Sequence, residues 1–330
     1  MIRLPLIFIL FPIFSFGQLC DSLLLESIVN PGPYSISSID ENSGVRNGPD
    51  YSGSTIFFPT NLSLNMLPSI VLVPGFMNSE LTIQNWGDFF ASHGIVTMTI
   101  GTNLLTDSHI KRRDALLDAI ISLKKENQRI SSPLFGKIDT TSVAVGGFSK
   151  GGGGAQLVPK LNPNISAILS LYPWLDNPSS SDLNHSVPTM IISGQLDAFA
   201  PPGIHANVHY NLLPNTTKKL KYEIAFASHD AISGPNAGFG DVGVRALSWL
   251  KTFLLVDSCY CPIAVLEPST SSSFITNLEC DLISDQIEFF SDAKINEVRD
   301  IFGRITQQKF NTPLIFFFND GRVEKKIILK

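Results

Sequence analysis

Charged residues are scarce in this sequence: they make up 16% of its 330 positions, and the formal net charge is −5. There is no basic stripe and no motif that interleaves basic with aromatic residues, so nothing indicates a nucleic-acid partner. Beyond the N-terminus, no run approaches the 18 apolar residues of a membrane-spanning helix. The length is enough for one large domain, or for one large domain and a small one.

The N-terminus has the pattern of a signal peptide. Arg3 supplies a positive charge, and the apolar run from Leu4 to Phe16 is too short to span a membrane. Ser15 and Gly17 are the small residues expected at a cleavage site before Gln18. We therefore expect residues 1–17 to be removed. The mature protein would be secreted through the periplasm without a membrane anchor.

Cysteine is also rare, with four residues, which fits an exported protein with disulfides. Leu19 is bulky where a lipoprotein signal needs a small residue, so Cys20 is not expected to carry lipid. Cys259 and Cys261 are too close to bridge without strain. Cys280 is expected to pair with one of them, closing a loop worth about 3 kcal/mol, and Cys20 to take the other. The sequence leaves the pairing open.

One stretch indicates a nucleophile. The apolar run Val143–Val145 reads as a buried strand and leads into Gly147-Phe148-Ser149-Lys150-Gly151, a G-x-S-x-G pattern. This pattern describes a sharp strand-to-helix turn that exposes a serine, and larger side chains two residues before and after it would clash. The alternative is a phosphate-binding loop, but neither G-x-x-x-x-G-K-[ST] nor G-x-G-x-x-G occurs in this stretch.

Short apolar strands alternate with helices along the chain, which predicts an α/β fold with a mostly parallel sheet and helices on both faces. Such sheets bind ligands at the carboxyl ends of their strands. The expected strands cover 34–40, 54–59, 69–73, 95–100, 143–148, 165–171, 188–193 and 220–227, and the expected helices cover 78–92, 108–127, 203–213 and 242–254. The residues that lie just past strand ends are Phe76, Ser149, Trp174, Asp197 and His229.

A serine nucleophile on this fold needs an acid and then a histidine later in the chain. Asp176, Asp182 and Asp197 are the candidate acids. We favour Asp197 because it follows an apolar strand and a glycine-containing turn. His229 follows the last strand and is the expected general base. The other histidines precede the serine or the acid, or lie on the helix just after Asp197: His93, His109, His185, His205 and His209.

Two backbone N–H groups are expected to form an oxyanion hole. One belongs to Lys150, which follows the nucleophile, and the other to Phe76 in Pro74-Gly75-Phe76. Gly75 allows this loop to approach closely.

These stretches resemble the secreted polyester hydrolases, which are the bacterial cutinases and poly(ethylene terephthalate) hydrolases of the dienelactone-hydrolase-like α/β-hydrolase group. The resemblance covers about residues 30–280, through Val73–Phe76, Ala91–Gly94, Gly147–Gly153, Pro173-Trp174, Asp197–Pro201 and Ser228-His229. It implies the α/β-hydrolase fold, a shallow cleft, no cofactor, no metal and an aromatic clamp. Phe76 and Trp174 would form the clamp, with Phe148 and Phe199 beside it.

The sequence departs from this family at two places. Lys150 stands where methionine is usual, which brings a cation to the rim of the cleft. A second disulfide that some members carry is missing, since Gly194 and Ala231 stand near its positions.

The last 50 residues change character and predict a small all-β appendage, over 281–330. Asp300–Arg304 and Asn319–Lys330 resemble the C-terminal sorting domain of the type IX secretion system of Bacteroidetes. This resemblance implies an export address that is usually removed; the alternative is a module that binds the polymer surface.

The leading hypothesis is thus a monomeric serine esterase that cleaves polyesters, with its catalytic domain in 18–280. A second hypothesis keeps the triad but assigns it small soluble esters or lipids; no long lid insertion indicates a lidded lipase. A third is a non-catalytic surface protein on a hydrolase scaffold, which would not require an intact triad.

Overall fold

The computed structural model describes residues 28, 30–62, 66–229, 234–280, 295–300, 303–306, 313–318 and 323–327. The chain divides into two compact units between Cys280 and Asp281. The expected signal peptide, Cys20 and Ala231 lie outside the described residues. Within the described part of the chain, no helix is both long and apolar enough to cross a membrane.

The first unit is built on a nine-stranded sheet in the order β1-β2-β4-β3-β5-β6-β7-β8-β9. The strands from β4 to β8 pair in parallel, whereas β1, β2 and β9 pair antiparallel at the two edges. The bounds are β1 Ile36–Asp40, β2 Ser54–Pro59, β3 Leu67–Val73, β4 Val96–Ile100, β5 Ile138–Phe148, β6 Ala167–Leu171, β7 Thr189–Gly194, β8 Lys219–Ile224 and β9 Ser271–Thr276. This is the α/β-hydrolase sheet, and the predicted fold class is confirmed.

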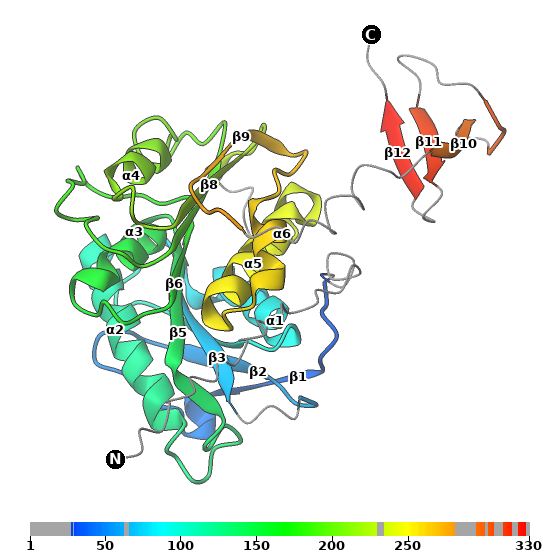
Figure 1. The fold of residues 1–330 in the computed structure, drawn as a ribbon. Coiled ribbons are helices and arrows are strands. Elements are labelled where there is room, and N and C mark those ends of the chain that lie inside the picture. Colours follow the sequence, from blue (N-terminus) through cyan, green and yellow to red (C-terminus); the bar gives the residue numbers. More distant parts are fainter. Residues whose placement is uncertain are drawn as a thin grey trace, which may run out of the picture. The chain divides into compact units, whose positions relative to one another are not determined.

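Helices cover both faces of this sheet (Figure 1). On one face lie α2 (His109–Glu126), α3 (Lys150–Leu157) and α4 (Ala206–Leu212); on the other lie α1 (Gln84–Ser92), α5 (Asp241–Leu254) and α6 (Cys261–Val265). Trp86 and Trp249 belong to the buried cluster on the α1/α5 face, and Leu116 belongs to the cluster under α2. Every residue of β3 is buried, as expected for a parallel strand covered on both faces.

Several boundaries differ from the sequence prediction. The helix expected over 78–92 is a 3-10 turn at Glu80–Ile83 followed by α1, and the helix expected over 203–213 shortens to α4. Among the described strands and α-helices of the first unit, β9 and α6 were not predicted. The sequence of β9 is rich in serine and threonine, and it becomes a strand by pairing with the edge of β8, a contact that local composition does not reveal.

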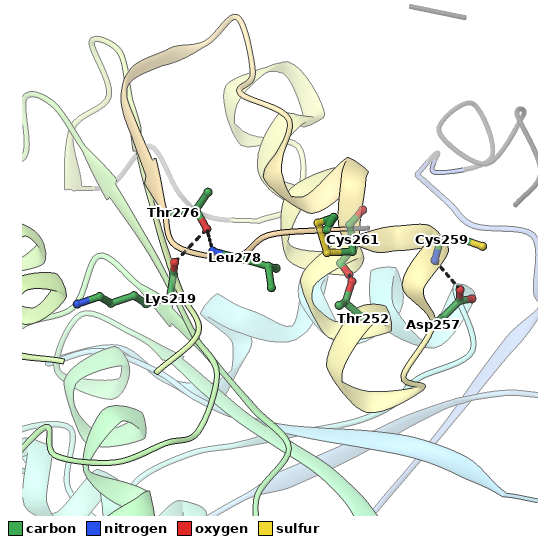
Figure 2. Close-up of a disulfide and its surroundings, with 9 residues drawn as sticks. Lys219, Thr252, Asp257, Cys259, Cys261, Thr276 and Leu278 are labelled. Carbon is green, nitrogen blue, oxygen red and sulfur yellow. Dashed lines mark hydrogen bonds between the residues drawn. A yellow bond between two sulfur atoms is a disulfide. The ribbon is translucent and has the colours of Figure 1, made fainter. Parts of the chain in front are cut away.

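A disulfide joins Cys261 on α6 to Cys280, which follows β9. Figure 2 shows how the end of β9 is also attached by hydrogen bonds: Thr276 Oγ1 donates to the carbonyl oxygen of Lys219 and accepts from the N–H of Leu278. Cys259 is disulfide-bonded as well. The sequence therefore anticipated a bridge from Cys280 correctly and left its partner open. The pairing expected for Cys20 falls outside the described residues.

The second unit contains a three-stranded antiparallel sheet of β10 (Ile295–Asp300), β11 (Pro313–Phe318) and β12 (Val323–Ile327). Strand β11 lies in the middle. The small all-β appendage was thus predicted correctly as a fold. For this appendage the sequence also predicts a strand over 286–290 and a turn at Asn319-Asp320-Gly321, and both lie outside the described residues.

Candidate active site

Ser149 lies on a sharp turn between β5 and α3. Its backbone has φ 54° and ψ −119°, a conformation that is uncommon for a residue with a side chain. Two hydrogen bonds fix the turn: Ser149 N–H donates to the carbonyl oxygen of Leu171 at 2.8 Å, and the carbonyl of Ser149 accepts from Trp174 N–H at 3.0 Å. The turn is therefore fixed to the end of the neighbouring strand β6.

The glycines around Ser149 are required by space. A Cβ atom on Gly147 would lie 2.6 Å from the carbonyl oxygen of Val73, and one on Gly151 would lie 2.4 Å from the same atom. A Cβ on Gly153 would lie 2.1 Å from the carbonyl oxygen of Trp174. The clash expected two residues on either side of the serine is present in the structure.

Asp197 and His229 form a buried pair. Asp197 follows β7, is 3% exposed and accepts a hydrogen bond at Oδ2 from His229 Nδ1 at 2.7 Å. Its other oxygen, Oδ1, accepts from the backbone N–H groups of Phe199 at 2.9 Å and Ala200 at 2.7 Å. With Nδ1 directed at the carboxylate, His229 keeps Nε2 as the nitrogen that can take a proton.

Ser149 and His229 line the same cleft, which has a volume of about 360 Å³. Between these two described side chains there is no hydrogen bond in the structure. Such bonds are often long without substrate and tighten when it binds. The remaining lining residues are Phe76, Met77, Asn78, Phe148, Lys150, Trp174 and Phe199.

Two backbone N–H groups beside Ser149 have no hydrogen-bond acceptor among the described residues. They belong to Phe76, in the loop after β3, and to Lys150, the first residue of α3. The N–H of Met77 next in the loop is already used, since it donates to the carbonyl of Leu105 at 2.8 Å. Gly75 allows this approach, because a Cβ there would lie 3.0 Å from Cβ of Ser149.

All four aromatic side chains expected near the clamp line the cleft. Phe76 is 45% exposed and Phe199 is 71% exposed. Phe148 is more enclosed and packs with its ring centre 4.8 Å from that of His229, which is also 5.6 Å from the ring of Phe199. The imidazole of His229 therefore contacts two phenylalanine rings.

The ammonium group of Lys150 lies inside the clamp. Its Nζ is 4.4 Å from the ring centre of Phe76 and 4.6 Å from the ring centre of Trp174. Both distances are within the range of a cation–π contact. The sequence predicted a cation at the rim of the cleft but not its position between the two rings.

The other candidate acids are engaged elsewhere. Asp176 is exposed and lies 3.5 Å from His109 Nδ1. Asp182 forms a surface ion pair with Lys160 at 2.9 Å and accepts hydrogen bonds from Ser179, which lower the pKa of Asp182 to about 2. Neither carboxylate reaches the cleft.

None of the other histidines lines the cleft, although two of them contact Trp174 of the clamp. His205 packs against Trp174 at 5.7 Å between ring centres, and His109 lies 6.4 Å from the same ring. Burial lowers the pKa of both. It also lowers the pKa of His209, whose ring centre lies 6.0 Å from that of His205, to about 3. His93 Nδ1 bonds to the carbonyl of Phe89.

Arg112 is a site residue that the sequence reasoning missed. It is fully buried on α2, where its Nε donates to the carbonyl oxygen of Pro74 at 2.9 Å and its Nη2 to that of Gly75 at 2.7 Å. It thus holds the loop that carries Phe76. A signal was present: Arg112 is a charged residue at helical spacing from the apolar Leu116 and Ile120.

Among the described residues, no group of three histidine, cysteine, aspartate or glutamate side chains is placed to hold a metal ion. A second hollow of about 330 Å³ lies away from Ser149 and is lined by Phe89, Asn236, Phe239 and their neighbours. None of the site residues predicted from the sequence lines this hollow.

An α/β-hydrolase sheet that presents a serine on a strained turn, beside a histidine paired with a buried aspartate, defines the class of serine hydrolases. Within that class, residues 25–280 match the model of the PETase family, described as PET hydrolase-like. The chain belongs to this family.

Named relatives agree with the family match. The chain is 35% identical over 237 residues to Cutinase 1 of Thermobifida cellulosilytica, covering 72% of this chain and 85% of that protein. It is 35% identical over 237 residues to a cutinase of Thermobifida fusca, covering 72% and 74%. It is 33% identical over 236 residues to the bis(hydroxyethyl) terephthalate hydrolase of Streptomyces coelicolor, covering 70% and 72%. The enzyme class is carboxylic ester hydrolase.

Proposed function

We propose that this protein is a secreted serine esterase that hydrolyses polyesters through an acyl-enzyme intermediate. The observation that carries the proposal is the hydrogen-bonded pair of Asp197 and His229 in the same cleft as Ser149 on its strained turn. Membership of the PET hydrolase-like family, with relatives named as cutinases, supports the polyester substrate.

In this mechanism Ser149 Oγ attacks the ester carbonyl carbon while its proton passes to His229 Nε2. Asp197 accepts the hydrogen bond from Nδ1 and stabilises the imidazolium, without itself taking a proton. The negative oxygen of the tetrahedral intermediate accepts hydrogen bonds from the unpaired N–H groups of Phe76 and Lys150.

Collapse of the intermediate breaks the ester C–O bond, and His229 returns the proton to the departing alcohol. A water molecule then attacks the acyl carbon while His229 takes one of its protons. The bond from that carbon to Ser149 Oγ breaks, His229 gives the proton to Ser149 Oγ, and the acid leaves. Removal of one oxyanion donor typically costs a factor of about 10² to 10³ in kcat.

Exposed apolar side chains near the cleft favour a solid polymer over a small soluble ester. Phe199 is 71% exposed, Leu196 is 60% exposed and Phe226 is 83% exposed. The turns that carry them are joined, because Leu196 N–H donates to the carbonyl of Ala227 at 2.9 Å. We call these three residues the apolar rim. Exposed apolar groups of this kind are suited to contact with an apolar surface.

Release of soluble acids from an amorphous aromatic polyester film tests the proposal, with Ser149→Ala as the matched variant. Acid release that disappears in the variant would support a polymer-active serine esterase. If neither protein releases acid while wild type still cleaves a soluble ester, the enzyme acts on small or aliphatic esters instead. Unchanged hydrolysis of a soluble ester by Ser149→Ala would reject the nucleophile.

The proposal extends to export. The signal-peptide pattern over 1–17 and the C-terminal resemblance to a type IX sorting domain together support passage through the periplasm to the exterior. The mature chain would begin at Gln18 and act as a monomer. N-terminal sequencing and the intact mass of protein recovered from the medium check both cleavage positions, and a mass equal to the full 36.1 kDa chain would contradict them.

A further inference from the structure

Lys150 places a positive charge where the acyl part of an ester must lie. Its backbone N–H is beside Ser149, and its side chain turns back between the rings of Phe76 and Trp174 at 4.4 and 4.6 Å. The side chain is only half-buried, so the ammonium group remains open to the cleft that it lines.

This ammonium group has no anionic partner of its own. Among the described residues, no ion pair and no hydrogen bond is formed by Lys150 Nζ, although an ammonium group has three N–H donors. The carboxylate of Asp176 is exposed and does not line the cleft, and that of Asp197 is covered by His229 and two backbone N–H groups. Among the described residues that line the cleft, Lys150 is therefore the one lysine or arginine, and it has no ion pair.

The two rings fix where this cation can act. A neutral aromatic acyl group that enters the clamp must displace the ammonium from both ring faces and loses two cation–π contacts. An acyl chain that carries a carboxylate at its far end can instead leave the ammonium in place and pair with it. Such a charge-assisted contact is stronger than a neutral hydrogen bond.

We propose that Lys150 makes the enzyme select esters whose acyl part carries a second, free carboxylate, namely half-esters of dicarboxylic acids. The acid-ended fragments released from a polyester chain are compounds of this class. The inference rests on the proposed esterase function and refines its preference: ester bonds next to a free terminal carboxylate, at polymer chain ends and in acid-ended fragments, are cleaved faster than uncharged ester units.

The test compares two soluble substrates of equal chain length, the para-nitrophenyl half-ester of adipic acid and para-nitrophenyl hexanoate. The measured quantity is the ratio of kcat/KM for the charged ester to that for the neutral ester. Lys150→Met is expected to lower this ratio about fivefold, as for the loss of a partly exposed ion pair, whereas Lys150→Arg retains it. Added salt should lower the ratio in wild type but not in Lys150→Met.

Lys124→Met is the matched control, because Lys124 is an exposed lysine on α2 and the substitution makes the same change in net charge. Its ratio should equal that of wild type. An equal fall in Lys124→Met would assign the effect to net charge and overturn the proposal. An unchanged ratio in Lys150→Met would overturn it as well.

Inhibition provides a second readout that a purely structural role of Lys150 would not change. Adipate should inhibit wild type competitively, and its inhibition constant should rise about fivefold in Lys150→Met. Hexanoate should show no such rise. Hydrolysis of the neutral ester keeps the two proposals separate. If this hydrolysis occurs and is lost in Ser149→Ala, the esterase proposal is supported for any value of the kcat/KM ratio.

Discussion

Arg112 holds the loop that carries Phe76, the proposed oxyanion donor, and does not itself line the cleft. It donates to the carbonyl oxygens of Pro74 and Gly75, the two residues before Phe76. Arg112→Met would leave the carbonyl of Pro74 without this donor and that of Gly75 with only the bond from Asn78 N–H at 3.3 Å, so the loop could move. A displacement of about 1 Å can cost a factor of about 100 in rate. We expect kcat to fall 10- to 100-fold, with a smaller change in KM.

Steady-state kinetics on a soluble neutral ester, together with thermal unfolding, check the Arg112 prediction. The Arg112→Lys variant retains a cation but not the paired hydrogen-bond geometry. Its kcat should lie between those of wild type and Arg112→Met. A folded Arg112→Met protein with the kcat of wild type would show that the loop holds its position without this side chain.

Asp197 acts on the orientation of His229. Asp197→Asn preserves an oxygen for the N–H groups of Phe199 and Ala200, but an amide that donates toward Nδ1 selects the wrong imidazole tautomer. The expected loss in kcat is about 10³- to 10⁴-fold with little change in stability. Asp182→Asn, at the surface ion pair with Lys160, is the control and should keep its kcat. Equal kcat values for the two variants would remove Asp197 from the mechanism.

The sequence predicted those site features that depend on order along the chain. Ser149, Asp197 and His229 each follow a strand, and parallel strands bring their carboxyl ends to one edge. The position of Lys150 between Phe76 and Trp174, and the bonds from Arg112, depend on side-chain direction between segments far apart in sequence. Such directions follow from tertiary packing, so a pattern of residue types does not determine them.

At the scale of elements, the turn after β8 exposes an aromatic side chain, that of Phe226, which is not packed into the core. Phe226 is 83% exposed with a φ of 58°, so both its side chain and its backbone are unfavourable there. Its N–H donates to Gln195 Oε1 at 3.0 Å, which ties it to the turn carrying Leu196. An exposed aromatic held in this way indicates a contact surface.

Phe226→Asn should therefore separate action on film from action on soluble esters. Asparagine tolerates the left-handed backbone, so the turn should be preserved. We expect adsorption to a polyester film to weaken about fivefold, with kcat/KM on a soluble ester unchanged. Phe239→Asn is the matched control, because Phe239 is also exposed with positive φ but lines the other hollow. Equal losses in both variants would contradict a specific role of the apolar rim.

Helix α4 carries a buried histidine that makes stability depend on pH. His209 is fully buried, contacts Gln156, and has its pKa lowered to about 3 by burial, against an ordinary value of 6.5. Between these values the unfolded chain binds a proton that the folded chain does not. The free energy of unfolding is therefore lost progressively as pH falls below about 6.5.

His209→Phe removes this titration while keeping a ring of similar size. On going from pH 7 to pH 5, the free energy of unfolding of wild type should fall by about 2 kcal/mol more than that of the variant. Chemical denaturation at the two pH values measures the difference, and any constant packing effect of the substitution cancels. An identical change with pH in both proteins would mean that folding does not lower the pKa of His209.

The elements with strong periodic or buried patterns were predicted from sequence, whereas those formed by long-range pairing were not. β3, β4 and β6 are mainly apolar, are buried along their whole length and match the predicted strands closely. β9 has the burial pattern of a partly exposed strand and a Ser-rich sequence. It exists because β8 offers an open edge and because Cys280 ties the end of the segment to α6.

At the scale of the whole molecule, the active site and the sheet belong to one unit. All nine strands of the main sheet, the cleft and the Cys261–Cys280 disulfide lie before Asp281, where the second unit begins. The second unit has its own three-stranded sheet, β10–β12. The first unit therefore contains every described residue that the proposed reaction uses.

A protein comprising residues 18–280 should thus fold and keep its esterase activity. We expect kcat/KM on a soluble ester to stay within about twofold of the longer protein, residues 18–330, because no described site residue is removed. Adsorption to polyester film distinguishes the two roles considered for the tail. Equal adsorption by both proteins supports an export address, whereas weaker adsorption by the shorter one supports a surface-binding module. A large loss of activity on the soluble ester would instead show that residues 281–330 are needed to complete the catalytic unit.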